Sequence, residues 1–199
     1  MLLRDDILSL RVPQPDPSPG SLLIAGPLLD QECFCRSTIC LIDHDNGSGT
    51  MGLVTNRESG CSLADLVDGV EREERVPVFV GGPVQTGRLY YLHRMGGLID
   101  GSEPVAPGLW AGGDFGKVLE LVNGGVKIEG NIRFFVGYSG WSAGQLRGEL
   151  DRYDWAVGPM GDPGSLLTLT EREAWRAAVM SLGSRYRVWL NFPLDAQLN

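Results

Sequence analysis

The clearest structural signal in the sequence is the stretch Ile132–Arg152, IRFFVGYSGWSAGQLRGELDR. Its apolar beginning, Ile132–Tyr138, predicts a strand at the centre of a sheet. Glycines follow, and Ser142 with Gln145 three residues later has the pattern of a helix capping box. The stretch therefore predicts a buried strand, a glycine turn and a helix that has Ser142 as its N-cap.

The first turn of this helix also has the pattern of a hydrophobic staple. Trp141 precedes the N-cap and Leu146 is the fourth helical residue, which are the two staple positions. Leu150 and Tyr153 continue the apolar face and are expected to point into the core. Because free backbone N–H groups at a helix start can hold an anion, this turn is a candidate ligand site.

The same glycines allow a catalytic interpretation. Gly137–Gly140 fits the first four positions of GxSxG, the motif that places a nucleophilic serine, here Ser139, on a sharp turn. The fifth position is Trp141, and both histidines, His44 and His93, precede the serine. We favour a tight turn with the tryptophan in the core. A hydrolase or transferase that uses Ser139 or His93 stays as an alternative.

Further elements are predicted on both sides of this stretch. Asp114, Thr170 and Ser62 are the expected N-caps of three helices. The expected strands are Ser21–Ala25, Ser37–His44, Met51–Asn56, Val76–Val80 and Arg88–Arg94, and the expected helices are Ser62–Val70, 115–122 and 171–182. Strands outnumber helices and several form apparent hairpins, which favours a mixed α+β fold over a doubly wound parallel sheet.

The beginning of the chain is rich in proline. Pro13, Pro15, Pro17 and Pro19 alternate with other residues. Because proline fixes φ and disfavours helix in the residue before it, the pattern predicts an extended tether. We therefore expect an N-terminal extension, residues 1–19, and a single folded domain, residues 20–199.

Composition and charge limit the classes of function. Hydrophobic residues make up 43% and charged residues 21% of the 199 residues, as in a soluble globular domain. The net charge is −8, which disfavours non-specific binding to nucleic acid or to an anionic membrane. A local basic face formed by Arg133, Arg147 and Arg152 stays possible. The sequence has no apolar run long enough to span a membrane and no signal-peptide pattern, so we expect a cytoplasmic protein.

Four residues close in sequence, Cys33, Cys35, Cys40 and His44, have the chemistry of zinc ligands. Their spacing is poor, because Cys40 and His44 are expected about 13 Å apart along one strand. Reduced thiols that pack as small hydrophobic groups are the favoured interpretation. No metal and no cofactor are therefore predicted.

Two other polar positions and one turn are candidates for a binding site. Arg57, next to Asn56 at a strand end, is suited to bind a carboxylate or a phosphate, although a solvated strand end is the favoured interpretation. His93 alternates with Leu89 and Tyr91 along its strand, which favours a core histidine with a satisfied ring. The turn at 81–83 is compatible with either a folding or a binding role.

Several motifs in combination resemble the AlgH/YqgE family of bacterial proteins. They are GSLLIAGPLLD (20–30), Phe34, RS (36–37), GTMGLVTNR (49–57), VGGPV (80–84), LH (92–93), RFFVGYSGW (133–141), GQL (144–146), EL (149–150) and Trp155. The ending NFPLDAQLN (191–199) is similar to that of Bacteroidetes-type members. The resemblance implies an α+β fold with a mixed, mostly antiparallel sheet curled into a partial barrel with flanking helices, in one domain or two intertwined subdomains. It also implies a cytosolic bacterial protein and supplies no reaction or catalytic residues.

The matching positions suggest one shared ligand-binding surface. Its candidate residues are Asn56, Arg57, Gly81, Gly82, Pro83, His93, Tyr138, Ser139, Trp141 and Gln145. The hypothesis that follows is a non-catalytic binding or regulatory module for a protein partner or a small anionic ligand. Because some family members are labelled transcriptional regulators, regulation is a further alternative, with direct binding to nucleic acid disfavoured. The partner and the oligomeric state stay open.

Overall fold

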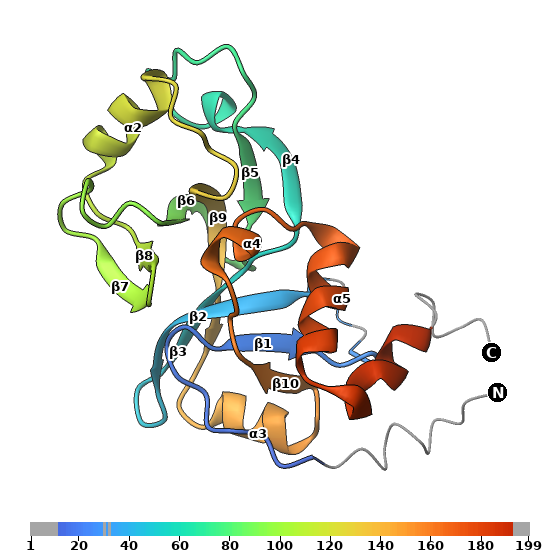
Figure 1. The fold of residues 1–199 in the computed structure, drawn as a ribbon. Helices are drawn as coiled ribbons and strands as arrows, with labels where there is room; N and C mark the ends of the chain where they lie inside the picture. The colour runs from blue at the N-terminus through green and yellow to red at the C-terminus, as the bar shows by residue number, and fades with distance from the viewer. Residues whose placement is uncertain (1–11, 30, 32, 193–199) are drawn as a thin grey trace.

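The computed structural model describes residues 12–29, 31 and 33–192 (Figure 1). The strands are β1 (Leu22–Ala25), β2 (Thr38–Asp45), β3 (Gly49–Val54), β4 (Glu58–Ser62), β5 (Pro77–Val80), β6 (Val84–His93), β7 (Glu103–Ala106), β8 (Leu109–Ala111), β9 (Ile132–Trp141) and β10 (Trp155–Gly158). The α-helices are α2 (Phe115–Asn123), α3 (Gln145–Asp151), α4 (Pro163–Leu166) and α5 (Glu171–Ser181), and the 3₁₀ helices are η1 (Leu63–Asp65) and η2 (Ser184–Asn191).

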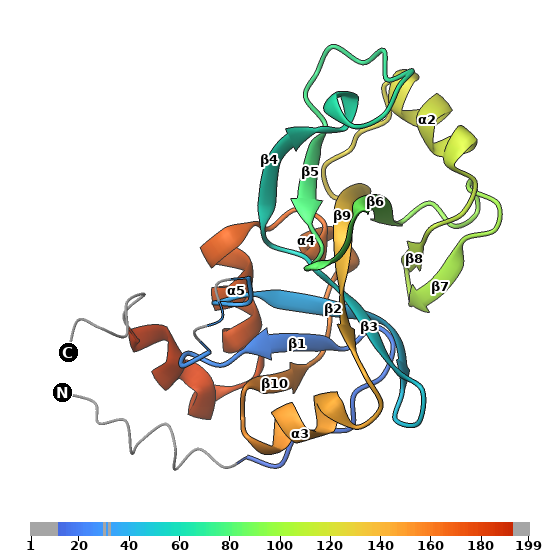
Figure 2. The same cartoon turned by 180° about the vertical axis from the view of Figure 1, so that it is seen from behind.

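The strand β9 lies at the centre of the fold, as its apolar sequence predicts. Its first half pairs in parallel with β5 and antiparallel with β6. Its second half pairs antiparallel with β3, where Gly52 lies opposite Ser139. Seen from both sides, β9 runs between the half of the molecule that contains β4–β8 and α2 and the half that contains β1–β3, β10 and α3 (Figures 1 and 2). This one strand therefore connects the two halves.

The fold is α+β, which confirms the prediction of a mostly antiparallel sheet with flanking helices. The strand order is β10-β1-β2-β3-β9-β6-β8-β7, and β5 joins β4 to β9. Of the described pairings, β5 with β9 is parallel and the others are antiparallel. The sheet is curled but does not close into a barrel.

Both faces of β9 are buried, and alternate residues face different core clusters. Ile132 and Phe134 pack with Val118 of α2. Phe135 points to the opposite side, into the cluster that contains Trp175 of α5. A strand covered on both faces reads as a nearly continuous apolar run, and this is why its sequence was informative.

Two helices begin where the sequence predicts and end within one residue of the predicted position. The carboxylate of Asp114 accepts a hydrogen bond from the Gly116 N–H at 2.9 Å and caps α2. Thr170 is the N-cap residue of α5, although its hydroxyl does not bond to the helix. The buried residues of α5 include Trp175 and Val179, which confirms the predicted apolar face.

The predicted helix Ser62–Val70 is wrong in its length. Only the 3₁₀ turn η1 forms, and the Ser62 N–H donates to the Asp65 carboxylate at 2.7 Å. Leu66 is 46% exposed, so little apolar burial supports a longer helix. Gly69 has a φ of +84°, which ends any right-handed turn there.

The predicted start of α3 is also wrong. The N-cap is Gly144, with a φ of +73°, and the helix begins at Gln145. The Ser142 N–H and hydroxyl donate to the Gln145 side-chain oxygen at 3.1 and 3.2 Å. Because the left-handed glycine turns the chain after Ser142, the helix begins three residues after it. Trp141 and Leu146 lie in one core cluster, but with Gly144 as the N-cap they do not occupy the staple positions that the sequence predicted.

Tyr153 was expected in the core and is instead 37% exposed. The helix α3 ends at Asp151, and Tyr153 has a φ of +62°, so it lies beyond the helix and off its apolar face. Leu150, the preceding residue of the same predicted face, is buried as expected.

The described part of the proline-rich segment lies against the outer edge of β10. The Gln14 side-chain oxygen accepts a hydrogen bond from the Val157 N–H at 2.8 Å, and its NH₂ donates to the Tyr186 hydroxyl at 2.8 Å. Gln14 thus supplies to β10 a partner that a further strand would otherwise provide. The domain boundary after residue 19 stays a prediction.

Candidate functional site

The turn at Gly81–Pro83 crosses β9 at very short range. The Gly81 N–H donates to the Val136 carbonyl at 2.9 Å, and the Gly81 carbonyl accepts from the Val54 N–H at 2.9 Å. A Cβ on Gly82, whose φ is +152°, would lie 2.3 Å from the carbonyl carbon of Tyr138. The glycines are therefore needed so that the two backbones can approach.

Ser139 is fully buried at this crossing. Its hydroxyl donates to the Gly81 carbonyl at 3.1 Å. His93 pairs with Ile132 at the other end of β9, seven residues away, which is about 23 Å at ~3.3 Å per residue. Ser139 and His93 are therefore too far apart to act as a nucleophile and its base.

His93 is fully buried and both of its ring nitrogens are used. Nδ1 accepts a hydrogen bond from the Met95 N–H at 3.1 Å, which assigns the ring proton to Nε2. Nε2 lies 3.0 Å from the Gly112 carbonyl and 3.1 Å from the Ser102 hydroxyl. Ser102 in turn donates to the Ile99 carbonyl at 2.6 Å. Since Nε2 carries the proton, it cannot take one from the Ser102 hydroxyl as a general base would. The His93–Ser102 pair is therefore part of a structural hydrogen-bond network.

Burial lowers the pKa of His93, partly offset by the hydrogen bond to Gly112. The unfolded chain therefore binds this proton more readily, and stability is lost as the pH falls below about 6.5. We expect His93→Gln to reduce the slope of unfolding free energy against pH between 6.5 and 4.5, by up to about 1.4 kcal/mol per pH unit. Urea unfolding at several pH values measures this slope, and His44→Gln is the control. Equal slopes in wild type and His93→Gln would contradict the assignment.

Trp141 and Gln145 belong to a polar cluster centred on Glu149. The indole N–H groups of Trp141 and Trp155 donate to one carboxylate oxygen of Glu149 at 2.7 and 2.8 Å. The Gln145 NH₂ donates to the other oxygen at 3.0 Å. These groups and Pro83 line a cavity of about 150 Å³. The carboxylate thus accepts three hydrogen bonds from within the fold, so the cluster holds α3 against β9 and β10.

Asn56 and Arg57 lie where β3 leads into β4. The Asn56 side-chain oxygen accepts from the Thr38 N–H at 2.9 Å, and its NH₂ donates to the carbonyls of Arg36 and Glu171 at 3.0 and 2.8 Å. Asn56 is thus a buried link between β2, β3 and the start of α5. Arg57 is half-buried, and its carbonyl accepts from the Val80 N–H at 2.8 Å.

The structure therefore brings most of the predicted site residues together. Gly81, Gly82, Pro83, Tyr138, Ser139, Trp141 and Gln145 gather where the 81–83 turn meets the end of β9, and Asn56 and Arg57 adjoin that turn. His93 lies at the far end of β9. Tyr138 is half-buried with its ring 5.8 Å from that of Tyr90, edge to face. Most of the polar groups among them already form hydrogen bonds with backbone or side-chain groups of the protein.

Among the described residues, the cysteines do not surround a common point with acidic or histidine side chains. Cys40 is fully buried, and burial raises the pKa of its thiol to about 12. Cys33, Cys35 and Cys61 are half-buried and free. Within the described residues, no three Cys, His, Asp or Glu side chains form a group that could hold a metal ion.

A different cleft, which we call the Arg133 cleft, has a volume of about 360 Å³. Its walls are β4 and β5, the segment before β5, the segment that leads into β9, and the chain between α4 and α5. The lining residues are Glu58, Arg72, Glu74, Arg75, Pro77, Phe79, Lys127, Ile128, Glu129, Ile132, Arg133, Leu167, Thr168 and Thr170.

Arg133 is the unusual group in this cleft, because it is a charged residue at a core position of β9. It is 4% exposed and lies on the same face of the strand as Phe135. Its Nη1 donates to the carbonyls of Thr55 and Leu169, and the guanidinium lies 4.1 Å from the centre of the Phe79 ring. The remaining guanidinium nitrogens have no acceptor in the described part of the chain.

No carboxylate of the described residues lies within 4.0 Å of the Arg133 guanidinium. Burial lowers the pKa of Arg133 to about 10, although the more distant charge of Glu58 opposes this shift. Arg133 is therefore a cation at neutral pH. A buried charge that lacks a counter-ion costs stability, and such groups concentrate at functional sites.

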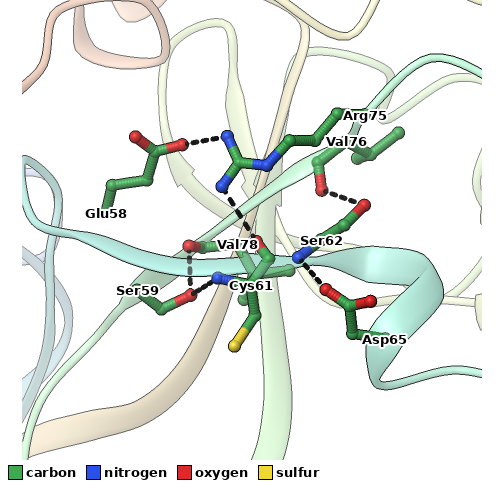
Figure 3. A network of polar contacts seen from close by, with 8 residues as sticks. All are labelled: Glu58, Ser59, Cys61, Ser62, Asp65, Arg75, Val76 and Val78. Atoms are coloured by element: carbon green, nitrogen blue, oxygen red, sulfur yellow. Dashed lines mark hydrogen bonds and ion pairs between the residues drawn. The ribbon is translucent and has the colours of Figure 1, made fainter.

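Glu58 forms no ion pair with Arg133, and its carboxylate is paired with Arg75 instead. The Arg75 guanidinium donates to the Glu58 carboxylate at 2.7 Å and to the Cys61 carbonyl at 3.4 Å (Figure 3). The Ser59 hydroxyl donates to the Val78 carbonyl at 2.6 Å, which fixes β4 to β5. This network holds the Glu58–Arg75 pair at the rim while Arg133 faces the interior.

Another groove is larger but lacks a buried charge. It has a volume of about 600 Å³ and lies between β2–β3 and β6–β8. Its charged lining residues, Asp43, Arg88 and Glu103, are all exposed. Solvent screens such charges, so this groove makes a weaker case for an ion-binding site.

Arg133 is not among the candidate site residues predicted from the sequence, although the sequence contains a signal of its unusual position. It was considered only as part of a basic face with Arg147 and Arg152. The three residues do not form such a face, since Arg133 is buried near the start of β9, while Arg147 pairs with Asp151 and Arg152 with Asp154 beyond the other end of the strand, after Trp141. An arginine inside an otherwise apolar strand, as in Ile132–Val136, was the available signal, because such a strand is buried on both faces.

The comparisons with known proteins identify the family. A sequence model of the AlgH-like family matches residues 22–187. The UPF0301 protein of Bacteroides thetaiotaomicron is 35% identical over 193 residues, which cover 97% of each chain. The chain belongs to the AlgH-like family. This AlgH-like chain is also 38% identical to the UPF0301 protein of Chlorobium phaeobacteroides over 180 residues, 90% of this chain and 95% of the relative. The resemblance seen in the motifs, including that to Bacteroidetes members, is confirmed.

Two solved structures have a similar fold. The protein DIP2367 from Corynebacterium diphtheriae superposes with a TM-score of 0.77 at 22% identity, covering 96% of this chain and 100% of that one. The solution structure of AlgH from Pseudomonas aeruginosa gives a TM-score of 0.68 at 30% identity, covering 90% and 97%. Among the described residues, none of the helices has the length and apolar character needed to cross a membrane.

Proposed function

We propose that this AlgH-like chain is a binding module that holds a small anionic ligand in the Arg133 cleft. The observation that carries the proposal is the buried cation of Arg133, which faces a cleft without a paired carboxylate in the described residues. An anion would supply the missing counter-charge and accept hydrogen bonds from the free guanidinium nitrogens. The proposed site lies away from Ser142, whereas Arg57 adjoins it in sequence, because the next residue, Glu58, lines the cleft.

The other candidate functions receive less support. The buried hydroxyl of Ser139 and the fully bonded ring of His93 offer no accessible nucleophile or base. A regulatory role through a protein partner is compatible with anion binding, because a bound ligand can shift the affinity for a partner. Direct binding to nucleic acid is disfavoured by the net charge of −8.

We also propose a cytoplasmic location. The described cysteines, Cys33, Cys35, Cys40 and Cys61, are all free thiols. Reduced thiols are typical of the reducing environment of the cytoplasm.

Thermal unfolding tests the proposed site. We expect an anion that binds the cleft to raise the Tm by roughly 5–10 °C at a hundredfold excess over its Kd, because ligand binding stabilises the folded state. The probes are the sodium salts of phosphate, sulfate, acetate, citrate and hexanoate at constant ionic strength. Sodium chloride is the reference.

The variant Arg133→Met removes the cation while keeping an apolar side chain of similar length, and it should lose the shift relative to its own Tm in chloride. Arg147→Met is the control, since Arg147 is exposed and paired with Asp151. It should keep the shift. The proposal is wrong if no anion raises the wild-type Tm above chloride, or if Arg133→Met retains the full shift.

A further inference from the structure

The chemistry of the Arg133 cleft narrows the class of ligand, and the argument rests on the proposed function. The first consideration is the geometry of the donor. Nη1 of Arg133 already donates to the carbonyls of Thr55 and Leu169. This leaves the edge formed by Nε and Nη2, and such an edge matches the two coplanar oxygens of one carboxylate.

The second consideration is the charge of the cleft. Its lining holds four basic side chains, Arg72, Arg75, Lys127 and Arg133, and three acidic ones, Glu58, Glu74 and Glu129, which gives a net charge of +1. Two of the basic groups are already paired, Arg72 with Glu74 and Arg75 with Glu58. A monoanion neutralises the cleft, whereas a dianion would leave it negative.

The third consideration is the apolar part of the walls. Pro77, Phe79, Ile128, Ile132 and Leu167 line the same cleft as the charged groups. Its volume of about 360 Å³ lies within the range of small-molecule sites, well above what one inorganic anion fills. An apolar chain or ring attached to the carboxylate would cover this surface and gain binding energy from its burial.

We propose that the ligand of the Arg133 cleft is a small monocarboxylate with an apolar body, whose carboxylate binds the free edge of Arg133 while the body packs on the half-buried side chains of Pro77 and Ile128. Lys127 lies at the cleft with no ion pair among the described residues, and it adds a weaker attraction for the same charge. Inorganic phosphate satisfies only the electrostatic part of the site.

Isothermal titration with matched probes tests this class. We expect hexanoate and benzoate to bind at least about tenfold more tightly than acetate, because the additional carbons are buried. Benzamide, which has the shape of benzoate without its charge, should bind at least about tenfold more weakly than benzoate. Inorganic phosphate should bind more weakly than hexanoate.

Three variants assign the binding to this cleft. Arg133→Met should abolish binding of hexanoate, and Arg133→Lys, which keeps the charge without the planar edge, should weaken it by about tenfold or more. Glu58→Gln changes an exposed rim residue and should tighten binding several-fold, because it removes a competing negative charge. This last variant keeps the test decisive if the Arg133 variants fold poorly.

The possible outcomes distinguish failure of the monocarboxylate proposal from failure of the proposed anion site. Arg133-dependent binding of phosphate, with hexanoate no tighter than acetate, would overturn the monocarboxylate class and leave the proposed function standing. Hexanoate binding of equal strength in wild type and Arg133→Met would show apolar adsorption only and overturn the class. Absence of binding by every anion would overturn both.

Discussion

Gly137→Ala is expected to lower the free energy of unfolding by more than about 3 kcal/mol, one of the largest effects of a single methyl group in this chain. Gly137 lies in β9 with a φ of +69°, a conformation that costs an L-residue about 1 kcal/mol. A Cβ there would also lie 2.4 Å from the Gly82 carbonyl oxygen and 2.9 Å from that of Val84. Both contacts are with backbone, so relief requires the 81–83 turn to separate from β9.

The control for this substitution is Gly144→Ala. Gly144 has a similar φ of +73°, but nothing lies within 4 Å of its added Cβ. It should therefore show only the cost of the left-handed conformation, about 1 kcal/mol. Urea unfolding followed by tryptophan fluorescence measures both variants. Equal losses in the two would mean that the close crossing of turn and strand does not contribute to stability.

Glu149→Ala is the second substitution with a large expected effect, a loss of about 3–5 kcal/mol. Two buried indole N–H groups, those of Trp141 and Trp155, would lose their acceptor, as would the Gln145 amide. Each unsatisfied buried donor costs about 1–3 kcal/mol. Chemical denaturation measures the loss, and the indole N–H resonances in an NMR spectrum report whether the two bonds break.

Two further variants serve as comparisons for Glu149→Ala. Glu149→Gln keeps one side-chain oxygen for the indoles and should cost less than half as much as the alanine variant. Glu120→Ala removes an exposed carboxylate that pairs with Lys117 on α2, and should change stability by about 0.5 kcal/mol or less. If Glu149→Ala behaves like Glu120→Ala, then the cluster does not anchor α3.

The sequence was most informative where local pattern and burial agree. The apolar run of β9, the capping residue Asp114 of α2 and the apolar spacing of α5 each predicted their elements because one or both faces are buried. The predicted helix boundaries are wrong where tertiary contacts, and not local sequence, determine where a helix begins or ends. Gly144, and not Ser142, is the N-cap of α3, and the helix after Ser62 stops at Asp65, where Leu66 is 46% exposed and gains little from burial.

The candidate site likewise has features that local sequence predicts and features that depend on tertiary contacts. The glycine turn and the end of β9 were expected to form one surface, and they do lie together, but the close approach of their backbones accounts for these residues. The apolar sequence around Arg133 indicated that the residue is buried, but not what surrounds its guanidinium, because that environment depends on strands and loops distant in sequence. Thr55 precedes β4, Phe79 lies in β5 and Leu169 precedes α5, and only the folded chain places all three around one guanidinium.

An NMR titration locates the ligand directly. In a uniformly ¹⁵N-labelled sample titrated with sodium hexanoate, and separately with sodium phosphate, we expect the Nε–Hε resonance of Arg133 to move most. The backbone amides of Lys127–Glu129, Thr168 and Thr170, which line the same cleft, should move with it. Shifts that cluster elsewhere on the molecule, or no shifts with either anion at millimolar concentration, would contradict the assignment of an anion site to the Arg133 cleft.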